Sequence, residues 1–121
     1  MLDAIAMLLR IEQRQIEPAI TIVELTGKLA MGRESQRIED LVDELAKAGE
    51  RKIILDMTGV DHIDSAGVGL VALAAGKLRE AGGRVVVVAP EGRVLHSLKM
   101  TQIDTIVKVV ATTAEAAAVF A

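Results

Sequence analysis

The chain has 121 residues, of which 51% are apolar and 26% are charged, a balance typical of a globular protein rather than a disordered one. Its formal net charge of −3 disfavours binding to nucleic-acid phosphates, and Phe120, the only aromatic residue, offers no platform for stacking bases. The absence of cysteine excludes disulfides, thiolate metal ligands and thiol nucleophiles.

The N-terminal ten residues are apolar, but Asp3 stands where a secretory peptide carries positive charge. No other stretch approaches the roughly 20 apolar residues of a membrane helix. We therefore expect a cytoplasmic protein without membrane contact, organised as a single domain over residues 1–121, with residues 1–8 as a candidate N-terminal extension. The apolar run Ala4–Leu9 suits two arrangements, pairing between chains in a homodimer or packing on the protein's own sheet.

Two β-like stretches, residues 9–15 and 20–26, flank a segment that contains Pro18, which predicts a hairpin. A loop is predicted over residues 27–32. Four apolar residues then recur at the i, i+3, i+4 and i+7 spacing of an amphipathic helix: Ile38, Leu41, Val42 and Leu45. We expect Gly49 to end this helix.

The run 52–57 is apolar with little alternation, which predicts a central strand covered on both faces. A loop links it to a helix over residues 65–81. The remaining predicted elements are a strand at 84–89, a helix at 91–100, a strand at 105–110 and a helix at 113–120. Strands that alternate with helices predict an α/β fold with a mixed, mainly parallel sheet of about five strands and four helices.

The connection between the central strand and the helix that follows it is the candidate site, because partners of open α/β sheets meet the C-terminal edge of the strands. Asp64 or Ser65 is expected at the helix N-cap, where a side-chain oxygen accepts from free backbone N–H groups. Gly67 and Gly69 would let another surface approach the first turn closely. Spacing alone supports a structural cap and a functional site about equally.

Residues of this connection also invite a metal or acid–base interpretation: Asp56, Asp61, His62 and Asp64. No second cluster completes a coordination shell, so no metal site is expected. Neither His62 nor His96 has a visible nucleophile partner, so the sequence does not support an enzyme. The glycines of residues 27–32 and 67–69 lack the Walker lysine and the full dinucleotide spacing, and no cofactor is expected. Three apolar residues near the loop are expected to be exposed for a protein partner: Met31, Val68 and Leu70.

Three segments carry a family resemblance: Leu25-Thr26-Gly27-Lys28-Leu29, Asp56-Met57-Thr58-Gly59-Val60 and Ile63-Asp64-Ser65-Ala66-Gly67-Val68-Gly69. They resemble the signature of the STAS domain, the fold of bacterial anti-sigma factor antagonists, and the similarity extends over essentially the whole chain. The resemblance implies that Ser65 is phosphorylated by an anti-sigma factor that is also a serine kinase, and that a PP2C-type phosphatase resets it. The unphosphorylated domain would bind the anti-sigma factor and so free the sigma factor for transcription.

The resemblance also implies a partner-binding surface around this serine: Met31, Thr58, Asp61, His62, Asp64, Ser65, Ala66, Gly67 and Val68. The chain departs from the family pattern at two positions. Ala66 replaces a second hydroxyl that many relatives carry, so Ser65 is the only acceptor in the loop apart from Thr58, and Ala30 stands where an acidic residue is common. Two alternatives remain open: a STAS scaffold or signalling adaptor in which Ser65 only caps its helix, and, as a lesser one, a nucleotide-binding STAS domain.

Overall fold

The computed structural model describes residues 9–16, 19–30 and 33–121, and this part of the chain contains the predicted five strands and four α-helices. The strands are β1 (Arg10–Ile16), β2 (Ile20–Leu29), β3 (Lys52–Ile63), β4 (Arg84–Val88) and β5 (Lys108–Val110). The helices are α2 (Arg33–Lys47), α3 (Ser65–Glu80), α4 (Arg93–Met100) and α5 (Thr113–Val119), with a 3₁₀ turn, η1 (Ile103–Thr105), before β5.

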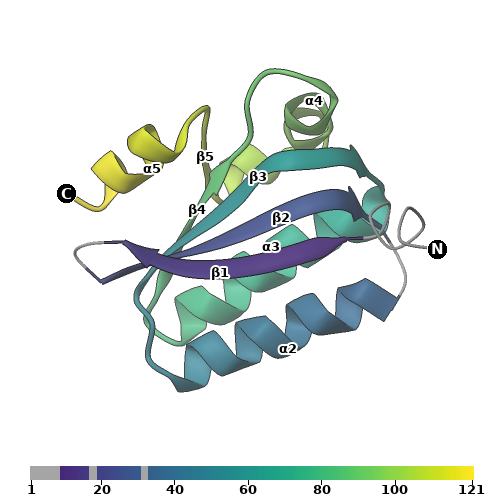
Figure 1. Cartoon of the computed structure of the whole chain (residues 1–121). Coiled ribbons are helices and arrows are strands. Elements are labelled where there is room, and N and C mark those ends of the chain that lie inside the picture. The colour runs from purple at the N-terminus through teal and green to yellow at the C-terminus, as the bar shows by residue number, and fades with distance from the viewer. Residues whose placement is uncertain (1–8, 17–18, 31–32) are drawn as a thin grey trace.

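The five strands form one mixed sheet in the spatial order β1-β2-β3-β4-β5 (Figure 1). The pair β1 and β2 is antiparallel, as the predicted hairpin requires, whereas the other three pairs are parallel. The strand β3 is central, as predicted. Pro18, on which the hairpin prediction rested, lies outside the described residues.

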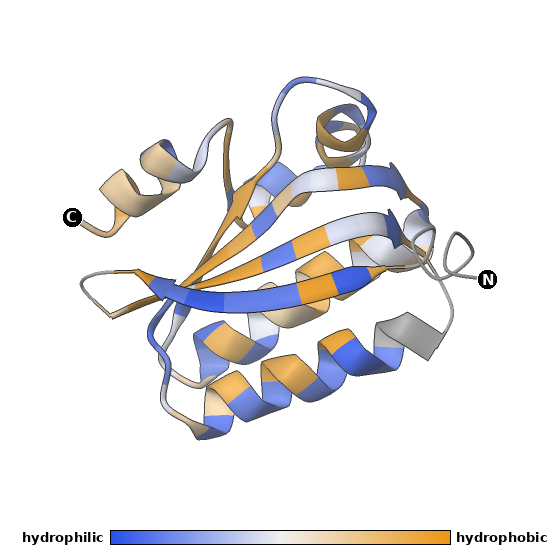
Figure 2. Ribbon diagram, viewed as in Figure 1, coloured by the Kyte–Doolittle hydropathy of each residue, from blue (hydrophilic) through white to orange (hydrophobic). Residues whose placement is uncertain are grey.

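One face of the sheet is covered by α2 and α3, which run side by side beneath it (Figure 1). The predicted apolar stripe of α2 faces the sheet and its charged side faces solvent (Figure 2), as the helical spacing requires. Gly49 has a φ of 74° just after this helix, a left-handed conformation that glycine adopts readily. The main core therefore lies between these two helices and the sheet.

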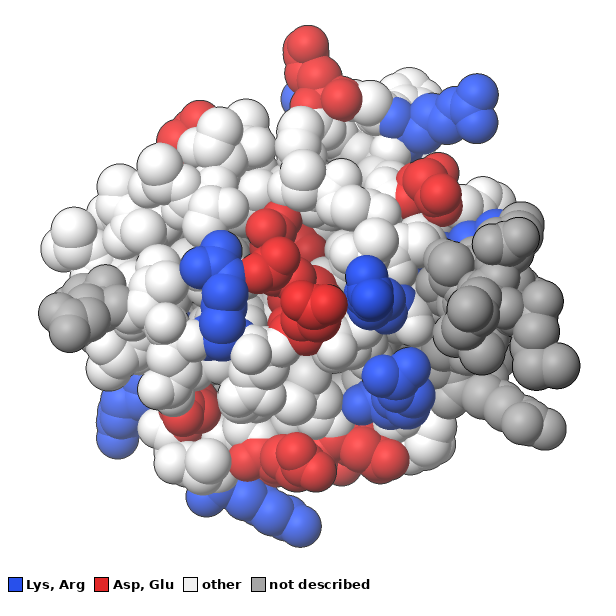
Figure 3. Space-filling model, viewed as in Figure 1, with Lys and Arg blue, Asp and Glu red and all other residues white. Residues whose placement is uncertain are grey.

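Among the described residues, the helix that covers part of the opposite face of the sheet is α5, which packs over one end of it. There a smaller buried cluster joins three strands to the helix: Ile20, Ile22, Ile54, Val86, Val88 and Ala116. Elsewhere on this face, acidic and basic side chains lie exposed side by side over β1 to β3 (Figure 3). No helix within the described residues has the length and apolarity needed to span a bilayer.

Two predicted loops are wrong in part, because β2 and β3 extend further by pairing with each other. Gly27 pairs with Val60 and Leu29 pairs with Ile63, so most of the expected loop after the central strand is itself strand. The predicted strand over residues 105–110 is shorter than expected, since its first residues belong to a turn. Gln102 has a φ of 60° and leads into η1, so that pairing with β4 begins only at Lys108.

Candidate functional site

The candidate site lies where β2 and β3 end and α3 begins, and the backbone of Asp64 joins all three elements. Its N–H donates to the carbonyl oxygen of Leu29 at 3.3 Å. Its Oδ1 accepts from the N–H of Gly67 at 2.8 Å, and its carbonyl oxygen accepts from the N–H of Val68 at 3.0 Å. Asp64 is thus the N-cap of α3, with the extended backbone that this position prefers.

Ser65 is the first residue of α3, and its side chain is exposed. Of the two residues expected at the N-cap, Asp64 supplies the cap and Ser65 does not. The Ser65 hydroxyl makes no hydrogen bond to any described residue. Its oxygen therefore stands at the surface of a helix N-terminus without a role in holding the fold together.

Gly67 is buried because the end of β2 lies directly against it. A Cβ at this position would lie 2.0 Å from the carbonyl oxygen of Leu29 and 2.9 Å from Cγ1 of Ile63. The surface that closely approaches Gly67 is therefore the end of β2 in the same chain and not a partner. Gly69 is exposed, and a Cβ there would meet nothing within 4 Å. Of the two glycines, only Gly69 leaves room for another surface.

The expectation that Val68 and Leu70 are exposed is wrong. Their exposed fractions are 8% and 9%, since both belong to the core beneath the sheet. The exposed large apolar residue of α3 is instead Leu73, which lies one turn after Gly69 and one turn before Gly76 on the outer side. Helical spacing from Ser65 places Gly69 and Leu73 on this same outer side.

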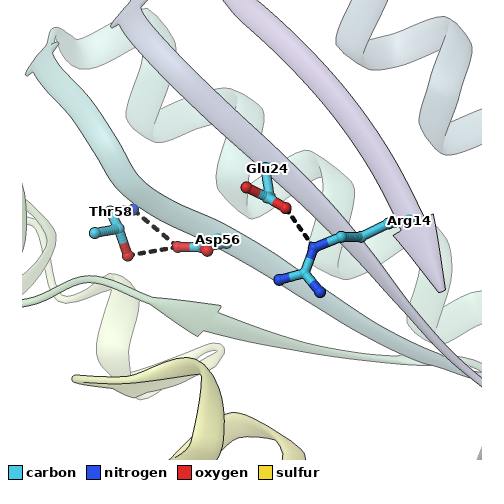
Figure 4. Close-up of polar contacts among 4 residues, drawn as sticks. All are labelled: Arg14, Glu24, Asp56 and Thr58. Atoms are coloured by element: carbon cyan, nitrogen blue, oxygen red, sulfur yellow. Dashed lines mark hydrogen bonds and ion pairs between the residues drawn. The ribbon is translucent and has the colours of Figure 1, made fainter. Parts of the chain in front are cut away.

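The segment before Asp64 is strand β3, whose pairing with β2 has two register shifts. Asp56 accepts hydrogen bonds at the first of them. Thr58 donates twice to Oδ1 of Asp56, from its backbone N–H at 3.0 Å and from Oγ1 at 2.6 Å (Figure 4). The register of β3 against β2 shifts by one residue between Asp56 and Gly59, where this contact lies, and again beside Asp61. On neighbouring strands of the same face, Arg14 forms an ion pair with Glu24 (Figure 4).

The acid–base and metal interpretation gains no structural support, because Asp56 is engaged by Thr58 and Asp64 by the start of α3. Among the residues that the structure describes, no three metal-ligating side chains gather at one point. Asp61 and His62 are both exposed on β3, where His62 pairs in register with Lys28.

A cleft of about 210 Å³ adjoins this part of β3. Thr58 and Asp61 line one side of it, and residues 90–94, which lead from β4 into α4, line the other. The residues of that second wall are not among the site residues predicted from the sequence. Residues 90–94 follow the parallel strand β4 and so lie at the same edge of the sheet as Ser65, which is the signal that could have identified them.

The nine predicted partner-binding residues therefore fall into distinct groups. Asp64, Ser65 and Ala66 form the accessible start of α3, and three more residues lie exposed on β3: Thr58, Asp61 and His62. Gly67 and Val68 are turned into the protein. Met31 lies outside the described residues.

The family model and the solved structures match most of this chain, and the curated relatives match a shorter part of it. The STAS domain family matches residues 11–116. A protein of Thermotoga neapolitana with the provisional name of anti-sigma factor antagonist is 35% identical over 74 residues, which are 61% of this chain and 66% of that protein. The chain thus matches about 66% of the length of such curated relatives.

Solved structures show the same architecture. A crystal structure from Thermotoga maritima, also named provisionally as an anti-sigma factor antagonist, superimposes with a TM-score of 0.78 at 25% identity over 88% of this chain and 90% of that one. The phosphorylated form of SpoIIAA from Bacillus superimposes with a TM-score of 0.70 at 19% identity over 93% and 100%, respectively. With the family match from β1 to α5 and the capped turn at Asp64 in place, the chain belongs to the STAS domain family.

Proposed function

We propose that this chain is an anti-sigma factor antagonist that binds an anti-sigma factor and is released when Ser65 is phosphorylated. The observation that carries the proposal is the Ser65 hydroxyl, which is exposed at the start of α3 and makes no hydrogen bond within the part of the chain that the structure describes. A kinase can therefore modify it without breaking a contact of the fold. The names of the Thermotoga relatives and the phosphorylated form of SpoIIAA support the same assignment.

A phosphate on Ser65 would act on the partner more than on the fold. It adds roughly −1.5 to −2 charges at pH 7, and the N-terminus of a helix tolerates negative charge. The first turn of α3 has no acidic residue of its own, although the Asp64 carboxylate lies just before it. A partner packed on this turn would have to desolvate or match the added charge, and a loss of about 1.4 kcal/mol already weakens binding tenfold.

The surface offered to the partner combines the start of α3 with its outer side. Ser65 and Gly69 are exposed and small, and Leu73, 38% exposed, supplies an apolar contact beside them. The cleft bordered by Thr58 and Asp61 extends this surface along the same edge of the sheet. The proposed partners are an anti-sigma factor with serine kinase activity and a PP2C-type phosphatase, and the chain itself acts by binding in the cytoplasm rather than by catalysis.

Phosphorylation is tested by incubating the protein with ATP and each serine-kinase anti-sigma factor of the host, followed by mass spectrometry. We expect one kinase to add a single phosphate at Ser65 and none to modify Ser65→Ala. The proposal fails if no kinase of the set modifies the protein.

Binding to the same anti-sigma factor is then measured by calorimetry. We expect Ser65→Ala to bind as the unmodified protein does, and Ser65→Asp to bind at least tenfold more weakly. Thr113→Asp is the matched control, because Thr113 is the first residue of α5 and follows the capping Thr112 as Ser65 follows Asp64. It places the same charge on a helix N-terminus elsewhere and should leave binding unchanged. Equal binding by Ser65→Asp and Ser65→Ala would contradict a switch at Ser65.

A further inference from the structure

We propose that a cleft at the end of the molecule opposite Ser65 binds a small organic anion that carries an apolar group. The cleft has a volume of about 360 Å³ and lies between the second half of α3 and the beginnings of β4 and β5. Ser65 follows the C-terminal end of β3, whereas this cleft lies at the N-terminal edge of the strands. Along α3, Ser65 and Arg79 of the cleft are separated by roughly 21 Å at 1.5 Å per residue, so the cleft is a separate site.

Three basic residues line the cleft: Arg79, Arg84 and Lys108. All three are exposed, and within the described residues none forms an ion pair. The lining contains no acidic residue, although the chain as a whole has a net charge of −3. Such a concentration of unpaired positive charge favours an anion.

The structural role of a helix end accounts for only one of these cations. Arg79 stands in the last turn of α3, where the helix dipole favours positive charge. Arg84 and Lys108 instead begin neighbouring parallel strands, which have no comparable dipole. Lys108 pairs with Val86, two residues beyond Arg84, so the Cα atoms of Arg84 and Lys108 lie about 8 Å apart. That spacing lets two long side chains reach one anionic group.

The same cleft presents an apolar surface. Val85 and Val107, each 6% exposed, belong to the core and form part of its lining. Ile106 lies beside them at 58% exposed and is one of three exposed large apolar side chains within the described residues. A ligand with an apolar group would cover Ile106 while its anionic group meets the cations, and the volume is within the usual range of small-molecule sites.

The proposal is tested with 8-anilinonaphthalene-1-sulfonate, an apolar sulfonate whose fluorescence rises on binding. We expect saturable binding of one molecule per chain and at least a tenfold rise in Kd for the double variant Arg84→Gln/Lys108→Gln. Lys28→Gln is the matched control, because Lys28 is an exposed cation on β2 outside the cleft, and its Kd should not change. Circular dichroism and thermal unfolding establish that each variant is folded.

A competition series separates the two parts of the ligand. We expect n-hexyl phosphate to displace the fluorescent probe at a lower concentration than either inorganic phosphate or hexanol. Equal affinity of the double variant and the unmodified protein for the probe would overturn the proposal, because the cations would then have no role. Displacement by inorganic phosphate or by hexanol as effective as that by hexyl phosphate would overturn the assignment of a ligand with both groups.

Discussion

The inner and outer sides of α3 differ sharply over its first three turns. On the inner side, Gly67 is pressed against the carbonyl of Leu29, and Val68 and Val71 belong to the core. On the outer side, Ser65 and Gly69 are exposed, and a Cβ on Gly69 would meet no atom within 4 Å. Two glycines only two residues apart therefore serve different purposes.

The inner side fixes where α3 begins, and the outer side leaves that beginning accessible. The Leu29 carbonyl accepts from Asp64, so it cannot move away from Gly67 without losing that hydrogen bond. The cap then holds Ser65 at the first helical position. A mobile serine would also be modifiable, but a serine held in a fixed turn lets one phosphate change a defined binding surface. Substitutions on the two sides should accordingly have opposite effects on stability.

The largest effect is expected from Gly67→Ala. Its methyl group would lie 2.0 Å from a backbone oxygen, so that the end of β2 or the start of α3 must shift. Overpacking of this kind costs about 3 kcal/mol, because backbone cannot rotate away as a side chain can. The free energy of unfolding in urea measures the loss. An unfolding free energy within about 0.5 kcal/mol of the unmodified protein would show that the inner contact is not rigid.

The sequence predicts the strands of this molecule well wherever the signal is local. Apolar runs identified the first part of β2 and all of β4. The apolar residues at helical spacing from Ile38 to Leu45 identified α2. The extensions of β2 and β3 were missed because they depend on pairing between distant segments. Gly27 and Gly59 are weak strand formers, and each becomes strand only by pairing with the other segment, Gly27 with Val60 and Gly59 with Thr26.

The candidate site was found from sequence only in outline, for the same reason. The motif placed Ser65 at a helix start, but the inward turn of Gly67 and Val68 depends on where Leu29 lies. The choice of Asp64 over Ser65 as the cap is a difference of one residue, which spacing does not resolve. The cationic cleft joins residues of α3, β4 and β5 and follows from no single segment.

A smaller loss is expected from Asp64→Ala, which removes the side chain that caps α3. Loss of an N-cap oxygen typically costs about 1 kcal/mol, since the N–H of Gly67 would lose its acceptor. Urea unfolding measures this cost. Asp64→Asn is the matched control, because it keeps an oxygen that accepts a hydrogen bond, and it should retain most of the stability. Equal losses for the two variants would assign the effect to charge rather than to the cap.

The smallest change is a gain, expected from Gly69→Ala on the outer side. Alanine is favoured over glycine inside a helix by up to about 1 kcal/mol, and here the methyl group meets no neighbour. Gly76→Ala is the matched control, because Gly76 lies two turns further along the same helix and is equally open. Both variants should raise the free energy of urea unfolding by similar amounts.

The two variants should differ once the anti-sigma factor is added, because only Gly69 lies one turn from Ser65. If the partner packs closely on the start of α3, a methyl group at Gly69 separates the surfaces and weakens binding, while Gly76→Ala binds as before. Calorimetry with the unphosphorylated proteins distinguishes these outcomes. Unchanged binding by Gly69→Ala would mean that its openness reflects only solvent exposure, and the partner surface would then have to lie toward the cleft beside Thr58 and Asp61.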